Sequence, residues 1–387
     1  MGPFLKLGLI SFGGPVAHLA YFREEFVRRR AWLSDLDYAD LVALCQSLPG
    51  PASSQVVFAL GMRRAGWPGA LAAAACFTTP SAILMILCAR FVTAAGDLSK
   101  AGWLHGLKLT AVAVVAQAVW GMGRSLCPDW PRVALAVAAS AMAMAFPSPA
   151  TPVFLIAIGT LAGWLLYRHA IPQAEPAADH SARKETRAGA FALGLFILLL
   201  VGLPPLAAVT GNHAVALFDS FYRSGSLVFG GGHVVLPLLR AEMATRGWVS
   251  DDALLAGYGL AQAVPGPLFT FAAYLGAMIH GPSRAWLGGL WCLLGIFLPG
   301  WLLIGGVLPF WSRLRNRAWS RAALHGANAV VVGLLFAAFC HPVWTEGVHD
   351  FRDALAAALL WTLLNIFRVP AWAVVTLAGA AGQWMSR

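Results

Sequence analysis

Charged residues are scarce in this chain, and their scarcity excludes an ordinary soluble protein. Only 11% of the 387 residues are charged, whereas a soluble domain has about a quarter. Acidic residues are the scarcer kind, with 17 Asp and Glu against 27 Lys and Arg, which gives a net charge of +10. This excess is typical of loops that follow the positive-inside rule and touch lipid headgroups, and part of it could form a positive field for an anion.

The chain also lacks the motifs of the common redox and phosphate-transfer enzymes. It has no CxxC pair, no dinucleotide fingerprint, no Asp-rich metal motif and no facing His pairs suited to haem. We therefore expect no cofactor, no bound metal, no catalytic residue and no nucleic-acid partner. The cysteines lie mostly within apolar segments and are predicted to be small packing residues: Cys45, Cys76, Cys88, Cys127, Cys292 and Cys340.

Long hydrophobic runs dominate the chain instead. Hydrophobic residues make up 59% of it, and the mean hydropathy is +0.70. Because a bilayer crossing needs about 20 apolar residues, the sequence predicts an all-α polytopic membrane protein with about thirteen segments. The predicted segments are 4–21, 38–62, 69–91, 103–123, 133–145, 152–167, 190–209, 214–239, 253–279, 286–310, 323–342, 354–367 and 371–384.

An internal duplication organises these segments. The pattern F-x-[K/R]-x-G-x-x-x-F-G-G occurs at 4–14 and again at 221–231, and "QSLPGP" at 46–51 recurs as "QAVPGP" at 262–267. The spacing predicts two homologous transporter repeats, 1–168 and 213–387, joined by a polar linker at 169–189 and an extra span at 190–212. Six segments per repeat and one between them would invert the second repeat, a common transporter plan.

Each repeat carries two helix-breaking motifs, FGG and PGP. Proline inside a helix removes a hydrogen bond, and glycine tolerates positive φ, so the helices must be interrupted there. Interrupted helices can present free amides and a positive dipole end to an anion, although kinks and close packing are the simpler use of Gly and Pro in membranes. The candidate binding residues in these motifs are Ser11, Gly13, Gly14, Gln46, Pro49, Gly50, Pro51, Gly230, Gly231, Gln262, Pro265, Gly266 and Pro267.

Two cations, Lys6 and Arg223, occupy the same repeat position before FGG. A charge at membrane depth is costly, so we expect the pair either to flank one dianion or to reach the membrane surface. His18, His105 and His325 are candidates for proton coupling, with packing as the alternative.

Other polar residues are predicted to have structural roles. Glu25 and Glu242 are predicted to pair with Arg23, Arg28 or Arg240 at the surface. Ser34 and Ser250 are predicted to cap the helices that follow them.

The stretch from Phe4 to Gln55, with FGGP, WLS and LPGP in order, closely resembles the amino-terminal domain of the chromate ion transporter family in its long, two-domain form. The second half carries a weaker copy, from "FGGGHVVLPLL" to "QAVPGPLFTFAAYLGA". The resemblance implies export of chromate from the cytoplasm across the bacterial inner membrane, driven by the proton motive force. It also brings in sulfate, a tetrahedral anion that resembles chromate in shape.

The residues themselves indicate at most a pseudo-symmetric anion site that works by alternating access. A carrier of sulfate or another oxyanion stays open as an alternative, and a membrane-embedded enzyme is a remote one. The expected partners are a chromate-like or sulfate-like dianion, membrane lipid and a possible second copy of the chain.

Overall fold

The structure is a computed structural model that describes residues 1–12, 14–94, 102–148, 150–167, 183–228, 234–311 and 318–385. Within these ranges every regular element is a helix, as predicted. Six helical stretches of the described chain are long and apolar enough to cross a membrane: Ala52–Ala94, Gly102–Leu126, Ala150–Tyr167, Thr186–Thr210, Leu268–Phe310 and Ala322–Gly347. The chain is a multi-pass membrane protein.

The elements follow the predicted repeat. The first half contains α1 (Gly2–Ile10), α2 (Gly14–Phe22), the π-helical η1 (Arg23–Arg29), α3 (Asp35–Ser47), α4 (Ala52–Ala94), α5 (Gly102–Leu126), α6 (Trp130–Ala145) and α7 (Ala150–Tyr167). After α8 (Arg183–Thr210), the second half contains α9 (His213–Leu227), α10 (Val235–Arg246), α11 (Asp251–Ala263), η4 (Leu268–Thr270), α12 (Phe271–Val307), η5 (Leu308–Phe310), α14 (Ala318–Ala338), η6 (Phe339–Trp344), α15 (Thr345–Gly347), α16 (Phe351–Asn365) and α17 (Ala371–Met385).

The helix interruptions predicted at FGG and PGP are confirmed. In the first half, α1 ends at Ile10 before FGG, and α3 ends at Ser47 before LPGP. In the second half, α9 ends at Leu227 and α11 at Ala263, again just before the two motifs. Proline and glycine therefore break all four helices where their chemistry requires it.

The long elements α4 and α12 each contain a helical hairpin. The backbone of α4 is non-helical at Ala65 and Gly66, where Gly66 has φ +61°. A Cβ on Gly61 would lie 2.5 Å from the carbonyl oxygen of Gly69 and 2.7 Å from the Cβ of Ala73, so the chain folds back on itself there. In α12 the same turn occurs at Gly281, and Gly276 packs on the backbone of Gly288. The separate predicted segments 38–62 and 69–91 match this turn.

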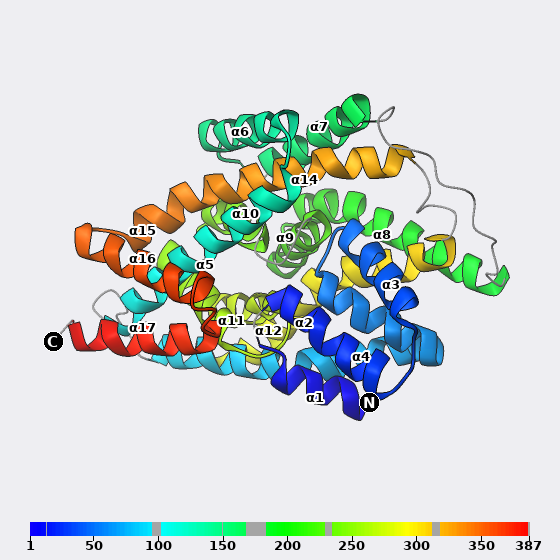
Figure 1. The fold of residues 1–387 in the computed structure, drawn as a ribbon, viewed down its shortest axis with the longest axis horizontal. Helices are drawn as coiled ribbons and strands as arrows, with labels where there is room; N and C mark the ends of the chain where they lie inside the picture. The colour runs from blue at the N-terminus through cyan, green and yellow to red at the C-terminus, as the bar shows by residue number, and fades with distance from the viewer. Residues whose placement is uncertain are drawn as a thin grey trace.

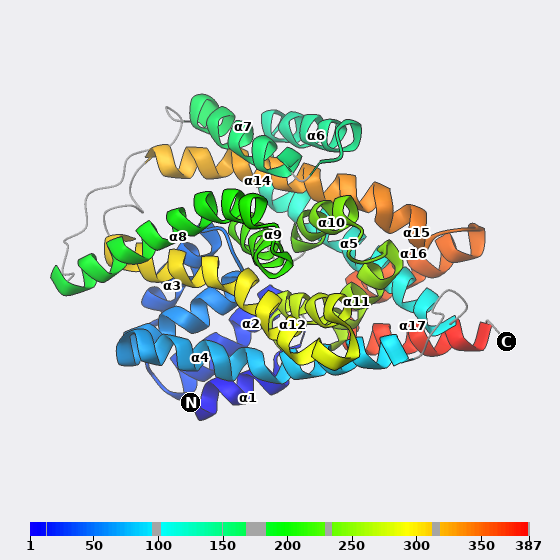
Figure 2. The ribbon, with the colours of Figure 1, turned by 180° about the vertical axis from the view of Figure 1, so that it is seen from behind.

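The two repeats interlock rather than forming separate bodies. In Figures 1 and 2 the orange α14 runs beside α6 and α7 of the first half, while α5 lies against α16 and α17 of the second. Glycines allow both contacts: Gly326 packs on the carbonyl oxygen of Gly159, and Gly106 on that of Ala378. Each half therefore uses one helix, α5 or α14, to cover the last two helices of the other half.

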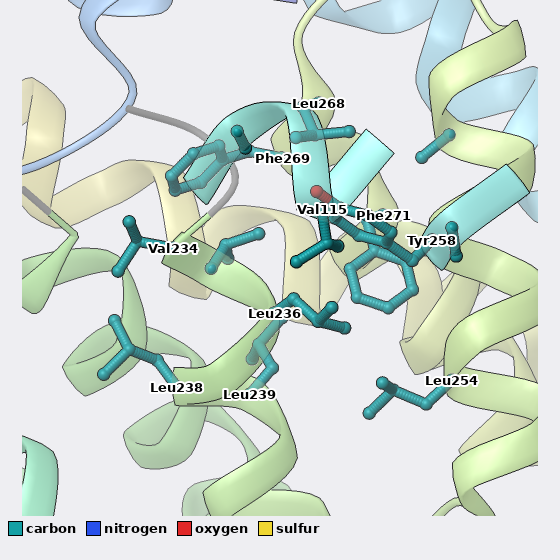
Figure 3. Close-up of a cluster of buried hydrophobic side chains, with 14 of the residues drawn as sticks. Val115, Val234, Leu236, Leu238, Leu239, Leu254, Tyr258, Leu268, Phe269 and Phe271 are labelled. Carbon is teal, nitrogen blue, oxygen red and sulfur yellow. The ribbon is translucent and has the colours of Figure 1, made fainter. Parts of the chain in front are cut away.

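The core is apolar and shared between the repeats. Figure 3 shows Val115 of α5 among Leu236 and Leu239 of α10, Leu254 of α11 and Phe271 of α12. In contrast, α8 has a largely exposed apolar surface at the edge of the molecule, with Phe191 73% exposed. Such a surface suits contact with lipid tails.

Candidate functional site

The broken helices of the two repeats meet in two reciprocal crossings. The amide of Gly266 in the second PGP donates a hydrogen bond to the carbonyl oxygen of Ser11 at 2.8 Å. The amide of Gly50 in the first PGP donates to the carbonyl oxygen of Val228 at 2.6 Å. Both donors and both acceptors are repeat-equivalent, with offsets of 216 (266 − 50) and 217 (228 − 11). The contacts are reciprocal, as expected for an approximate two-fold relation between the halves.

Both crossings need glycine. Gly50 has φ +118° and Gly266 has φ +104°, in the region that other residues rarely adopt. A Cβ on Gly266 would lie 2.7 Å from Ser81 Oγ, and one on Gly50 would lie 2.8 Å from Gln55 Nε2 and 3.2 Å from Gly300 Cα. The crossings therefore pack tightly against the second helices of α4 and α12.

These hydrogen bonds correct one expectation. The PGP glycine amides were predicted to be free for an anion, but both donate to carbonyl groups of the other repeat. The amides at a broken helix end need hydrogen-bond acceptors, and here carbonyl groups of the opposite repeat accept from them. Main-chain donors for an anion therefore do not come from Gly50 or Gly266 in this conformation.

Side chains at the crossings have unused hydrogen-bonding capacity instead. Several buried polar atoms on residues that form or flank the crossings have no partner within the described chain: Ser11 Oγ, His18 Nδ1, Gln55 Oε1, Thr78 Oγ1 and Gln262 Nε2. Buried polar atoms are rarely left unsatisfied, and a water or ligand is the usual explanation. Of these atoms, the hydroxyls of Ser11 and Thr78 and the amide nitrogen of Gln262 can donate to a tetrahedral oxyanion, whereas Gln55 Oε1 can only accept.

The other predicted motif residues differ in their contacts and in their burial. Pro49 carbonyl oxygen accepts from Gln55 Nε2 at 2.8 Å, and Pro51 lies 3.1 Å from where a Cβ on Gly300 would be. Pro265 and Pro267 are buried, Gly14 opens α2 with φ +76°, and Gln46 is exposed. Gly13, Gly230 and Gly231 lie outside the described residues.

Lys6 and Arg223 lie in equivalent ion-pair networks. Lys6 Nζ contacts Glu25 Oε2 at 3.2 Å, and Arg30 Nε donates to the other oxygen of Glu25 at 2.8 Å. Arg223 Nη2 contacts Asp219 Oδ2 at 2.9 Å and Glu242 Oε2 at 3.0 Å. Glu25 and Glu242 are themselves repeat-equivalent, with an offset of 217 (242 − 25). The side chain of Lys6 is 48% exposed and that of Arg223 only 19%.

The ion pairs of the two networks differ in composition. Two cations share Glu25 in the first half, whereas two carboxylates share Arg223 in the second. Hydrogen bonding from Arg30 holds the pKa of Glu25 below its usual range, while burial raises the pKa of Glu242. Both carboxylates lie outside the six candidate spans.

The predicted surface pairing of the two glutamates is therefore wrong. Arg23 instead contacts Asp35 at 2.7 Å. In the second half Arg240 contacts Asp251, the repeat equivalent of Asp35, at 3.0 Å. Each glutamate follows the arginine of such a pair by two residues but is buried, and it contacts Lys6 in the first half or Arg223 in the second. The caps are as predicted: Ser34 accepts from the amide of Asp37, and Ser250 from that of Ala253.

The three candidate histidines occupy different environments. His18 is 1% exposed, and its Nε2 lies 3.1 Å from Ser11 oxygen, directly at a crossing. His105 Nε2 lies 2.6 Å from Asp353 Oδ1, whereas the equivalent His325 Nδ1 lies 3.3 Å from Arg132 Nη1. Both of these contacts join one repeat to the other.

Sequence reasoning assigned no site role to Gln55, Thr78, Ser81 or Asp219. Gln55 and Asp219 have no polar repeat counterpart, since Phe271 and Gly2 stand at the equivalent positions. A search for symmetric residues therefore passes over them. The equal offsets of Lys6 with Arg223 and of Glu25 with Glu242 were the available signal for the ion-pair networks.

Comparison with known proteins agrees with the two repeated regions. The family model described as Chromate transporter matches residues 2–164 and 215–383. The chain is 29% identical to the chromate transport protein of Pseudomonas aeruginosa, over 99% of this chain and 90% of that protein. It is 24% identical to a probable chromate transport protein of Synechococcus elongatus, over 98% and 93% of the two chains. No solved structure shows significant similarity to the chain. With both repeats matched over nearly their whole length, the chain belongs to the chromate transporter family.

Proposed function

We propose that this protein exports chromate from the cytoplasm across the bacterial inner membrane, by alternating access and at the expense of the proton motive force. In this proposal helices of the two interlocked transporter repeats, 1–168 and 213–387, move relative to one another. Membership of a transporter family also removes the membrane-enzyme alternative.

The observation that carries the proposal is the pair of reciprocal crossings with unused polar atoms. Ser11, Thr78 and Gln262 offer buried hydrogen-bonding groups where helices of both repeats are broken. A site between repeats is where alternating-access carriers bind their substrates. Lys6 and Arg223 supply the positive charge that a dianion requires, once their ion pairs with the carboxylates have separated.

Flux in everted membrane vesicles tests the proposal. The wild-type protein takes up chromate when the membrane is energised, and Lys6→Gln or Arg223→Gln abolishes uptake at an unchanged amount of protein in the membrane. Arg28→Gln, which loses only an exposed pair with Glu24, is the matched control and transports normally. Normal transport by both single variants would remove Lys6 and Arg223 from the site.

A carrier of sulfate or another tetrahedral oxyanion is the second candidate. Hydroxyl and amide donors such as Ser11 and Gln262 recognise the shape and charge that chromate and sulfate share. Competition decides between the two: a generic carrier loses chromate uptake when sulfate is in excess. A chromate-selective carrier keeps its uptake.

A further inference from the structure

One buried carbonyl oxygen accepts hydrogen bonds from both repeats. The oxygen of Ser11 lies 2.8 Å from the amide nitrogen of Gly266 in the second repeat and 3.1 Å from Nε2 of His18 in the first. Ser11 is fully buried, and His18 is only 1% exposed. Two N–H groups from different repeats therefore converge on a single oxygen atom in the interior of the protein.

His18 is the donor in its contact with Ser11. A carbonyl oxygen can only accept, so the imidazole carries its hydrogen on Nε2 and has none on Nδ1. The ring packs on Phe22 and Phe77, with centroid distances of 6.2 Å and 5.9 Å. Burial lowers the pKa of His18, which lies outside the six candidate spans, so the ring is neutral at neutral pH. The imidazole is therefore a neutral N–H donor whose direction is fixed by its packing.

The arrangement has the geometry of an oxyanion hole. Such holes hold an anionic oxygen with preorganised donors at about 2.7–3.1 Å, away from water. The Gly266 amide is directed by a φ of +104°, which other residues rarely adopt. Ser11 is the central residue of a tight turn, with φ −81° and ψ 88°, in which the amide of Phe12 donates to the oxygen of Ile10 at 3.0 Å. Because α1 ends at Ile10, the Ser11 carbonyl can leave its two donors without unwinding that helix.

The second crossing has an apolar residue in place of the imidazole. The oxygen of Val228 accepts from the amide of Gly50 at 2.6 Å, as the repeat predicts. Val235 stands at the repeat position of His18, with an offset of 217 (235 − 18), and it is fully buried. A valine side chain cannot donate a hydrogen bond. The two crossings therefore share their backbone contact and differ in this side-chain donor.

We propose that Nε2 of His18 and the amide of Gly266 form an oxyanion hole for the transported anion, and that the carbonyl oxygen of Ser11 fills this hole in the present conformation. The inference rests on the proposed function and names two donors of its anion site. Hydrogen bonds to a charged acceptor are about twice as strong as those to a neutral one, so an oxygen of chromate or sulfate can replace the carbonyl.

Replacement of the Ser11 carbonyl links anion binding to movement of the repeats. An anion that takes the amide of Gly266 removes one of the two backbone hydrogen bonds that join the broken helices. The bond between Gly50 and Val228 stays in place, because no imidazole accompanies it. A ligand shifts a conformational equilibrium only by binding one state better, and here the better state is the one in which the first crossing has separated.

Chromate binding to the purified full-length protein, measured by equilibrium dialysis, tests the inference. His18→Val gives the first crossing the side chain of the second and weakens binding at least about tenfold, because a donor to a charged group is lost. His18→Gln supplies another neutral N–H donor and restores most of the affinity. Val235→Ala changes the equivalent position of the second crossing and is the matched control, with wild-type affinity. Melting temperatures without anion are compared as well, since a purely structural role of His18 lowers them and leaves the affinity intact.

Each outcome decides one of the two ideas. Wild-type affinity in folded His18→Val overturns the oxyanion hole but leaves the transporter proposal standing, and so does an equal loss in His18→Gln. A wild-type protein that binds no chromate overturns the proposed function, and the oxyanion hole with it. Should His18→Val not fold, hydrogen exchange of the wild type decides. Saturating chromate then speeds exchange of the amides in 7–12, beside the first crossing, and leaves those in 44–50 unchanged, whereas unchanged or slower exchange in 7–12 overturns the oxyanion hole.

Discussion

Gly50 donates its backbone amide to the carbonyl oxygen of Val228, 178 residues away (228 − 50), and thereby joins the first PGP break to the second FGG break. The equivalent hydrogen bond, from the amide of Gly266 to the carbonyl oxygen of Ser11, joins the second PGP break to the first FGG break. Movement of one repeat against the other must strain or break these two bonds. We therefore expect substitutions at the crossings to affect both stability and transport.

Alanine at the crossing glycines should destabilise the protein. Gly266→Ala must adopt a positive φ, at a cost of about 1–2 kcal/mol, and must also displace Ser81. Gly66→Ala must also adopt a positive φ, +61°, but has open space around it, so it is the control for a backbone cost without a steric clash. Thermal unfolding in detergent should rank wild type above Gly66→Ala and Gly66→Ala above Gly266→Ala. Equal stability of the two variants would mean that Gly266 is not closely packed.

Acid should weaken the first ion-pair network. The pKa of Glu25 is held below its unfolded value, so its contribution is present above the unfolded pKa and is lost as pH falls through the folded one. Glu25→Gln should therefore cost about 1 kcal/mol at neutral pH, a modest value because Lys6 is half-exposed. Melting temperatures of wild type and variant should differ at neutral pH and converge as the pH is taken well below the unfolded glutamate pKa of about 4.3. A constant difference across this range would contradict the ion pair.

Glu242 should show the opposite dependence. Its pKa is raised on folding, so its stability contribution is full below the unfolded pKa and is lost as pH rises through the folded value. Wild type should therefore lose stability relative to Glu242→Gln as the pH rises above the unfolded glutamate pKa of about 4.3. Parallel melting curves for Glu25→Gln and Glu242→Gln would show that the two networks do not differ in charge balance.

Gln55 should be essential for an intact crossing. Its Nε2 donates to Pro49 oxygen at 2.8 Å and lies 3.4 Å from Gly300 oxygen, and the side chain is fully buried. Gln55→Leu leaves two carbonyl groups unsatisfied at about 1–3 kcal/mol and removes a polar atom from the site. Chromate uptake should fall at least about tenfold with protein still in the membrane. Gln46→Leu, at an exposed position, is the control that should leave the fold unchanged.

The contact between His105 and Asp353 should stabilise the interlocked repeats. Replacing either residue with Asn should cost about 1–2 kcal/mol, and the double variant should cost little more than one single change. Additive losses in this double-mutant cycle would show that the two side chains do not interact. His280→Asn, which loses a contact with the carbonyl oxygen of Gly276 in its own helix, controls for loss of an imidazole.

The helical breaks could be predicted from sequence because they are local. Pro49, Gly50 and Pro51 cannot continue a helix whatever surrounds them, and their recurrence at 265–267 identified the repeat. The partners of the broken ends could not be predicted this way. Nothing in the residues near Gly50 specifies that Val228 will accept its hydrogen bond.

The ion-pair networks were missed for a related reason. Lys6 and Glu25 lie on opposite sides of the FGG break, so helical spacing says nothing about their distance. Only the path of the chain through that break brings them together. Asp219 shows a second limit, because its effect on Arg223 has no counterpart in the first repeat.

The exchange of partners between α5 and α14 has a consequence for assembly. Half of this chain would leave α5 without α16 and α17, and an apolar helical face would stay uncovered. A polypeptide carrying one repeat alone would therefore need a second copy, or a companion gene product, to complete it. Cotranslational insertion of the first half must likewise await synthesis of the carboxyl-terminal helices before its tertiary structure is finished.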